Sequence, residues 1–226
     1  KKIKSAITKK TKAIMPVHWA GRPCELDKIR TIAKKYNLKI IQDASQAIGR
    51  IIMSQTSRDQ SFPAMVLVTS DRFVEHVPPR GHPERPERAD VMAFVAKEYR
   101  SQGGTVVEPQ EVDSAALTRV HSSEYVELIA STRGGRVQLD PDTHTSPESE
   151  SVARLAVGAT LSAVDYAIDG GGRACAFVRP PGHHAERSRA MGFCLFNNVA
   201  AAAAHALERG LCRVAVVDYD VHHGNG

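Results

Sequence analysis

The sequence is poor in cysteine and aromatic residues and contains no long apolar run. Its 226 residues include 4 Cys and 1 Trp, and Phe, Trp and Tyr together make up 5%. The cysteines never form a C-x-x-C pair, which predicts reduced thiols and a cytoplasmic protein. Because no stretch of about 18 apolar residues occurs, we expect no membrane span. The basic start "KKIKSAITKK" is not followed by an apolar stretch, so no signal peptide is predicted.

The net charge of +5 is unevenly distributed. Residues 1–64 contain 14 Lys and Arg against 4 Asp and Glu, whereas residues 65–226 contain 16 against 21. Because the positive excess belongs to one short segment, nucleic-acid binding is disfavoured. The difference instead predicts two pieces of different origin. Their junction is predicted at residues 51–64, where periodicity is lost and Ser, Gln and Arg collect.

The first piece is predicted to be a β-α-β fragment. Apolar runs at residues 13–17 and 38–42 flank a stretch, 26–36, whose apolar residues have helical spacing. Such a unit buries its strands only within a larger sheet.

The second piece alternates strand-like and helical patterns. Strands are predicted at 65–69, 105–108, 174–178 and 213–218, and helices at 87–101, 123–131, 148–168 and 198–210. Alternating elements with fully apolar strands predict an α/β fold whose parallel sheet is covered by helices on both faces. Sites in such folds lie at the carboxyl ends of the strands.

Two polar clusters stand at predicted strand ends. If the chain stays extended after Val217, Asp218, Asp220 and His222 share one side and offer zinc oxygen and nitrogen ligands. Alternatively, these residues cap turns and pair with neighbouring basic side chains. In "RPPGHHAE" (179–186), His183 and His184 are suited to proton transfer, or they are ordinary solvated loop histidines. Zinc lowers the pKa of a bound water to about 7, and a carboxylate behind a neighbouring His fixes its tautomer.

Six ordered motifs carry a family resemblance: "HPERPER" (82–88), "VHSSEYV" (120–126), "LDPDTHTSPES" (139–149), "RPPGHHAE", "MGFCLFNNVA" (191–200) and "VDYDVHHGNG" (217–226). With them, residues 65–226 resemble the zinc-dependent histone deacetylase and acetylpolyamine amidohydrolase family. The doubled proline resembles its class II and bacterial members. The resemblance implies an arginase/deacetylase-type α/β fold and hydrolysis of the N-acetyl amide of an acetylated lysine peptide or an acetylated polyamine.

The resemblance also assigns roles to single residues. Asp220 and His222 match zinc ligands, and Asp218, Asp220 and the backbone at His222 match a potassium site. His183 and His184 match the general base and acid pair, backed by Asp218 and Asn225 respectively. The substrate-contacting positions are Gly192 and Phe193 in the wall of the acyl-lysine tunnel, Asp142 at its rim and Arg88 near the acetate exit. For Phe193 a core residue, and for Arg88 a surface residue, are the alternatives.

One departure from the family pattern affects the expected activity. The family takes its third zinc ligand from a later Asp and stabilises the oxyanion with a later Tyr, and both would fall beyond Gly226. The fold is therefore expected to be incomplete and zinc to be held weakly. Loss of an oxyanion donor typically costs about 100-fold or more in rate. We accordingly expect impaired activity.

The first piece has a different resemblance. "AITKKTKAIMPVHWAGRPCELDKIRTIAKKYNLKIIQDASQAIGR" resembles the DegT/DnrJ/EryC1 family of pyridoxal-phosphate sugar aminotransferases. Asp43 matches the residue that pairs with the pyridine nitrogen of the cofactor, and His18 lies in the same signature. No Schiff-base Lys is visible downstream, so we expect Asp43 to be vestigial and pyridoxal phosphate not to bind.

The expected organisation is therefore an aminotransferase-like fragment (1–50), a junction (51–64) and a deacetylase domain (65–226). A fusion or a mis-assembled gene would account for the change of pattern. Two rival functions stay open. One is an aminotransferase remnant, and the other is a non-catalytic module that binds acyl-lysine or polyamine. The sequence makes no prediction of oligomeric state.

Overall fold

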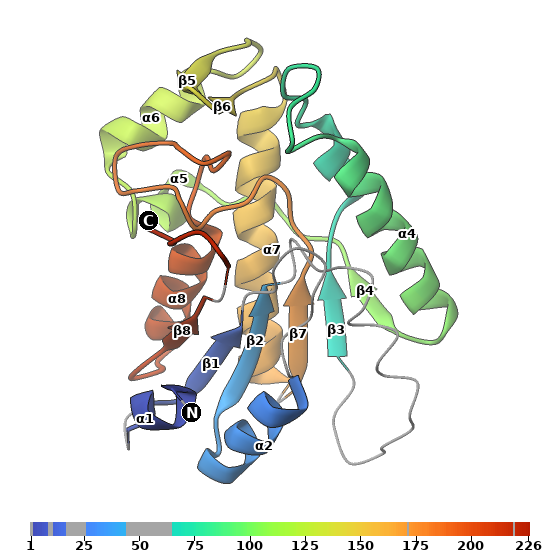
Figure 1. Cartoon of the computed structure of the whole chain (residues 1–226), viewed down its shortest axis with the longest axis vertical. Coiled ribbons are helices and arrows are strands. Elements are labelled where there is room, and N and C mark those ends of the chain that lie inside the picture. Colours follow the sequence, from blue (N-terminus) through green and yellow to red (C-terminus); the bar gives the residue numbers. More distant parts are fainter. Residues whose placement is uncertain (1, 9–10, 17–25, 44–64, 171, 219) are drawn as a thin grey trace.

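The apolar runs pair into one parallel sheet in the computed structural model, which describes residues 2–8, 11–16, 26–43, 65–170, 172–218 and 220–226. Among these residues the sheet has six strands, in the order β4-β3-β7-β2-β1-β8. Their arrows point toward one end of the molecule in Figure 1. The predicted parallel α/β sheet is confirmed. The strands are β1 (Ala13–Pro16), β2 (Lys39–Asp43), β3 (Met65–Val68), β4 (Thr105–Val107), β7 (Arg173–Ala176) and β8 (Ala215–Val217).

The strands of the N-terminal piece lie inside this sheet, between β7 and β8. Ile41 of β2 pairs with Ala174 of β7, and Ile14 of β1 pairs with Ala215 of β8. The predicted β-α-β unit therefore buries its strands by inserting between two strands of the second piece. The junction predicted at 51–64 falls outside the described residues.

Helices cover both faces of the sheet, as neighbouring residues of β1 show. Ala13 packs with α7 (Ser149–Asp169) and α8 (Asn198–Glu208), whereas Ile14 packs with α2 (Leu26–Tyr36). Because successive strand side chains point to opposite faces, α7 and α8 cover one face and α2 the other. Helix α4 (Glu87–Ser101) packs its buried residues onto β3 and β7.

Helix α7 is the central helix of the core. It has the length and hydropathy to cross a membrane, but 72% of its most apolar 18-residue stretch is buried against the rest of the protein. Gly158 of α7 allows close packing, because a Cβ there would overlap the carbonyl oxygen of Gln110. The burial and this close approach are those of a core helix.

Smaller elements were not predicted, apart from α6 (Ser123–Ser131). Beyond the strand ends lie a hairpin and the loop 177–197, in the upper part of Figure 1, and residues 220–226, which hydrogen-bond to that loop. The short elements are α1 (Lys2–Ala6), η1 (Asp71–Glu75), α5 (Ser114–Thr118), β5 (Gln138–Asp140) and β6 (Thr143–His144). The carboxyl end of the sheet is therefore where polar loops converge.

Candidate active site

Two histidines follow β7, and each is held by a residue that follows β8. The Nδ1 atom of His183 lies 2.9 Å from Oδ2 of Asp218, and Nδ1 of His184 lies 2.8 Å from Oδ1 of Asn225. Burial raises the pKa of Asp218, but the hydrogen bonds from His183 and from the backbone of Asp220 outweigh it and hold the pKa below its usual value. The Asp218 carboxylate is therefore ionised at neutral pH and accepts from Nδ1–H of His183.

The two imidazoles lie against each other, with ring centroids 4.1 Å apart. The ring of His222 is 6.0 Å from that of His184. Gly224 makes room for this arrangement, because a Cβ there would come within 2.7 Å of Oδ2 of Asp218. The structure thus brings together the two polar clusters, although β7 and β8 are not neighbours in the sheet.

Asp220 presents a buried carboxylate oxygen without a partner. Its side chain is only 1% exposed, and its Oδ2 makes no hydrogen bond in the described part of the protein. Its Oδ1 lies 3.1 Å from Nδ1 of His222, whose ring is 71% exposed. An unsatisfied buried carboxylate costs free energy, and a cation removes that cost. The two residues therefore offer the oxygen and nitrogen donors that zinc prefers.

Asp220 and His222 are the two metal donors that the described residues provide at this place. The described residues contain no group of three or more His, Cys, Asp or Glu side chains placed to hold one metal ion. The expected extended backbone after Val217 is also not observed, because the chain bends at residues 221 and 222. Instead, side chains shape the segment: the N–H of Asp220 donates to Oδ1 of Asp218, and that of His222 donates to Oδ1 of Asp220. The potassium site stays a prediction.

Gly192, which lies against His184, and Phe193 both have left-handed backbone conformations. Their φ angles are +57° and +69°. A Cβ on Gly192 would lie 2.6 Å from Cγ of His184, so only glycine lets the loop approach this ring. The N–H of Phe193 donates to Oγ1 of Thr143 at 3.1 Å, and its ring packs edge-on to His82 with centroids 4.7 Å apart. Phe193 is half-buried and is not a member of the core clusters, and its place in a tunnel wall stays a prediction.

Asp142 lies exposed in the turn between β5 and β6. Its carbonyl oxygen lies 2.9 Å from Nε2 of His82, and its Oδ1 accepts from the hydroxyl of Thr143. The turn is thereby tied to His82 and Thr143, the two residues that contact Phe193. His82 and Thr143 were not predicted as site residues, since their contacts join positions about 50 to 60 apart in the sequence.

For the remaining predicted residues, the structure gives less information about their position relative to the histidine pair. Arg88 is half-buried in the first turn of α4, where its charge acts on Glu84. Asp43 ends β2, with its backbone paired to Ala176, and nothing is described of its side chain. His18 lies outside the described residues.

A buried ion pair supports the loop that carries the histidines. Arg179 is 1% exposed, and its Nε and Nη2 donate to the two carboxylate oxygens of Glu84, each at 2.7 Å. The same guanidinium donates to the carbonyl oxygens of Phe73 and His76. This cluster ties the start of the "RPPGHHAE" loop to "HPERPER". Sequence reasoning missed it because Arg179 and Glu84 are 95 positions apart.

Acid should destabilise the protein through His76. Burial, and secondarily the charge of Arg179, lower the pKa of His76 to about 3. The unfolded chain binds a proton at this position below its ordinary pKa of about 6.5, whereas the folded protein does not. Proton uptake by the unfolded chain therefore does not affect the free energy of unfolding above about pH 6.5. Below it, the free energy of unfolding decreases as the pH falls toward 3, by up to about 1.4 kcal/mol per pH unit.

Urea unfolding at stepped pH values tests this expectation. The variant His76→Gln, which keeps a donor and acceptor for the hydroxyl of Ser149, should lose less stability between about pH 6.5 and pH 4 than the wild type. His223→Gln removes an exposed imidazole and is the matched control. Parallel stability curves for the wild type and His76→Gln would contradict the expectation.

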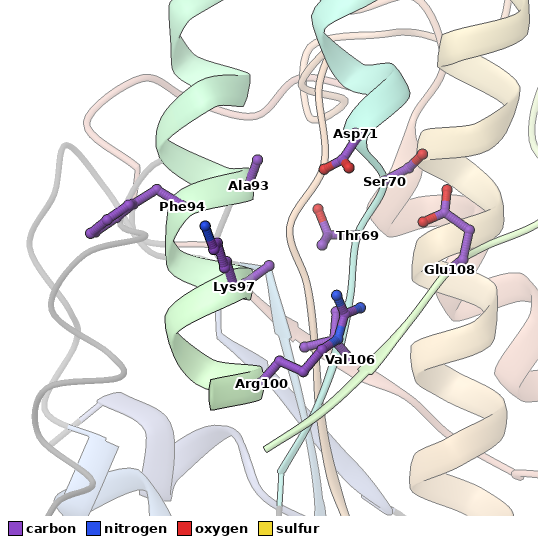
Figure 2. Close-up of a pocket in the computed structure, with 10 residues that line it drawn as sticks. Thr69, Ser70, Asp71, Ala93, Phe94, Lys97, Arg100, Val106 and Glu108 are labelled. Carbon is purple, nitrogen blue, oxygen red and sulfur yellow. The ribbon is translucent and has the colours of Figure 1, made fainter. Parts of the chain in front are cut away.

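A hollow elsewhere does not belong to this site. It has a volume of about 320 Å³ and lies between α4 and the ends of β3 and β4 (Figure 2). Lys97 and Arg100 of α4 face it, together with Asp71 and Glu108, so its charges are mixed. None of the predicted site residues lines it.

Comparison with known families agrees with this geometry. The model of the histone deacetylase domain matches residues 82–226, which include both histidines and the segment after β8. The chain belongs to the histone deacetylase family. The model of the DegT/DnrJ/EryC1/StrS aminotransferase family matches residues 1–58, so both predicted resemblances are confirmed.

Deacetylases from distant organisms are similar to this chain. A probable deacetylase of Methanothermobacter thermautotrophicus is 42% identical over 166 residues, covering 72% of this chain and 49% of that protein. The human polyamine deacetylase HDAC10 is 42% identical over 153 residues, covering 63% of this chain and 23% of HDAC10. The crystal structure of the HDA15 HD domain superposes with a TM-score of 0.67 at 34% identity, covering 73% of this chain and 49% of that one.

The predicted arginase/deacetylase-type fold is confirmed by this superposition, whereas the predicted domain bounds stay a prediction. The chain spans about half the length, or less, of the relatives it matches.

Proposed function

We propose that this site binds zinc and hydrolyses the N-acetyl amide of a primary amine, on an acetylated lysine peptide or an acetylated polyamine. One observation carries the proposal. Two adjacent imidazoles, each with its own hydrogen-bond acceptor, lie beside an imidazole and a buried carboxylate oxygen that lacks a partner. Metal-assisted hydrolysis requires proton-transfer groups next to a cation site.

Asp220 and His222 would hold the ion. When bound, zinc supplies Lewis-acid polarisation of the acyl oxygen and lowers the pKa of a water molecule to about 7. Two protein donors leave coordination positions that the described residues of this chain do not fill. Weak binding is therefore part of the proposal.

The paired histidines would move the protons. His183 donates Nδ1–H to the ionised carboxylate of Asp218, so the lone pair of its neutral ring, which accepts a proton, is on Nε2. His184 is held instead by the neutral amide of Asn225. Two imidazoles in unlike settings suit one proton acceptor and one proton donor at the same bond.

The chain also offers groups that position a substrate. The half-buried ring of Phe193 packs on His82, and its backbone N–H donates to Thr143; this ring would form one apolar side of a channel toward the histidines. Asp142, exposed at the β5–β6 turn, would bind N–H groups or a cationic amine at its mouth. The similarity to polyamine deacetylase HDAC10 and the match to the histone deacetylase domain support acetylated amines of either kind.

Zinc affinity tests the metal site directly. The variant Asp220→Asn should bind zinc at least about tenfold more weakly than the wild type, because a neutral amide replaces the ionised oxygen ligand. Isothermal titration with zinc measures the affinity. Asp90→Asn, which changes an exposed Asp of α4, is the matched control and should titrate like the wild type.

Turnover of an acetyl-lysine peptide and of an acetylated polyamine tests the reaction. We expect weak hydrolysis that requires zinc and disappears in His184→Ala. Binding of either substrate that is unaffected by zinc removal, without hydrolysis, would favour a binding module instead. A Schiff-base absorbance after addition of pyridoxal phosphate would favour the aminotransferase.

A further inference from the structure

Glu186 lies behind Asn225, on the side away from His184. Its Oε1 lies 2.7 Å from Nδ2 of Asn225, whose Oδ1 lies 2.8 Å from Nδ1 of His184. The sulfur of Met191 lies 3.2 Å from the same Nδ2. The amide of Asn225 therefore has acceptors around its nitrogen and an imidazole at its oxygen.

This arrangement determines which way the amide points. An ionised carboxylate only accepts hydrogen bonds, and a thioether sulfur is also an acceptor. Both require the NH2 group of Asn225 to face Glu186 and Met191. Its oxygen must then face His184, where it accepts a hydrogen from Nδ1.

The tautomer of His184 follows from the amide. With hydrogen on Nδ1, the neutral ring carries its lone pair on Nε2, the nitrogen not engaged by Asn225. If the amide were turned over, its NH2 group would face Nδ1 and move the ring hydrogen to Nε2. His184 would then be unable to accept a proton at that atom. His183 needs no such relay, because the carboxylate of Asp218 holds it directly.

The backbone of Glu186 is itself held in place. Its carbonyl oxygen lies 2.9 Å from Nδ1 of His121, and its N–H donates to the carbonyl of Arg189. Nε2 of His121 accepts from the N–H of Asn197 at 2.9 Å, so His121 donates from Nδ1. Burial lowers the pKa of His121, which agrees with this neutral form. Glu186 is thus fixed at both its backbone and its carboxylate.

We propose that Glu186 is a positioning residue that orients the Asn225 amide and thereby selects the Nδ1–H tautomer of His184. The catalytic meaning of that tautomer rests on the proposed function, whereas the tautomer itself does not. The effect is expected to be large, because charge-assisted hydrogen bonds are about twice as strong as neutral ones.

Nitrogen-15 spectra of the imidazole rings test the proposal. At about pH 8, above the ordinary histidine pKa, long-range ¹H–¹⁵N correlations distinguish the two neutral tautomers. His184→Gln identifies the signals of His184. The wild type should show Nδ1–H for His184. Glu186→Gln, which presents both a donor and an acceptor to Asn225, should lower the ratio of Nδ1–H to Nε2–H about tenfold or more.

A compensating double variant separates orientation from general damage. In Glu186→Gln combined with Asn225→Asp, the new carboxylate accepts from His184 and from the new amide that faces it, so Nδ1–H should return. Glu127→Gln, an exposed position, is the control and should leave the spectrum unchanged.

Wild-type tautomer ratios in Glu186→Gln would overturn the proposal. If that single variant does not fold, the double variant decides, and a His184 without Nδ1–H there overturns it equally. An inactive wild type with the expected tautomers would instead count against the proposed function alone.

Discussion

Replacing Ile14 by Asp should unfold the sheet together with the loops that carry the candidate site. Ile14 is 1% exposed and packs with Ile29, Ala33, Leu38 and Ile40. Its strand pairs with β2 on one side and with β8 on the other. A carboxylate at this position would be buried without a partner, at a cost of several kcal/mol. Proteins of this size are stable by only about 5–15 kcal/mol.

Unfolding in guanidinium, followed by hydrogen exchange of the amides in β7 and β8, measures the effect. Val91→Asp makes a comparable change at a residue that is 52% exposed on α4, and should cost below about 1 kcal/mol. The expectation would be contradicted if the N-terminal strands unfolded on their own, without the rest of the sheet. In that case, protection would be lost in residues 11–43 alone, while the amides near His183 and Val217 would keep their wild-type exchange rates.

Replacing Arg179 by Met should be the second severe change. The guanidinium satisfies both oxygens of Glu84 and two backbone carbonyls, all away from solvent. Removing it leaves a buried carboxylate without its counter-charge, which typically costs about 3–5 kcal/mol. Because Arg179 stands four residues before His183, the position of the histidine pair should be disturbed as well.

A double-mutant cycle with Glu84→Gln isolates the pair. The double variant should be less damaged than the sum of the two single variants, by about 2 kcal/mol or more, since no unpaired charge remains. Arg189→Met removes an arginine whose side chain is 60% exposed and pairs with Asp140 at 3.2 Å, and should cost below about 1 kcal/mol. Equal losses for Arg179→Met and Arg189→Met would refute the structural role of the buried pair.

Periodicity in the sequence was sufficient to predict the elements but not their neighbours. Each predicted strand of the sheet is present, because apolar runs of this length are stable only when buried on both faces. The same property hides the order of the strands. The residue pattern of a fully apolar strand does not indicate which strand lies next to it, so the insertion of β1 and β2 between β7 and β8 was not predictable.

The candidate site was predictable where neighbouring residues act together. His183 and His184, like Asp220 and His222, stand close in sequence at strand ends, which is why their convergence was expected. The residues that hold them were missed. Glu186 lies 39 positions from Asn225, and His121 lies 65 from Glu186. Such contacts depend on tertiary packing, for which a single sequence gives no local signal.

The insertion of β1 and β2 also determines when these strands can pair with their neighbours. Ile14 pairs with Ala215, about 200 positions later in the chain, and Ile41 pairs with Ala174, so neither pair can form until the later residue has been synthesised. Contacts of such high contact order slow folding, because the chain entropy is lost before the pairing is gained. During synthesis β1 and β2 would present open edges until β7 and β8 emerge, and open edges favour aggregation.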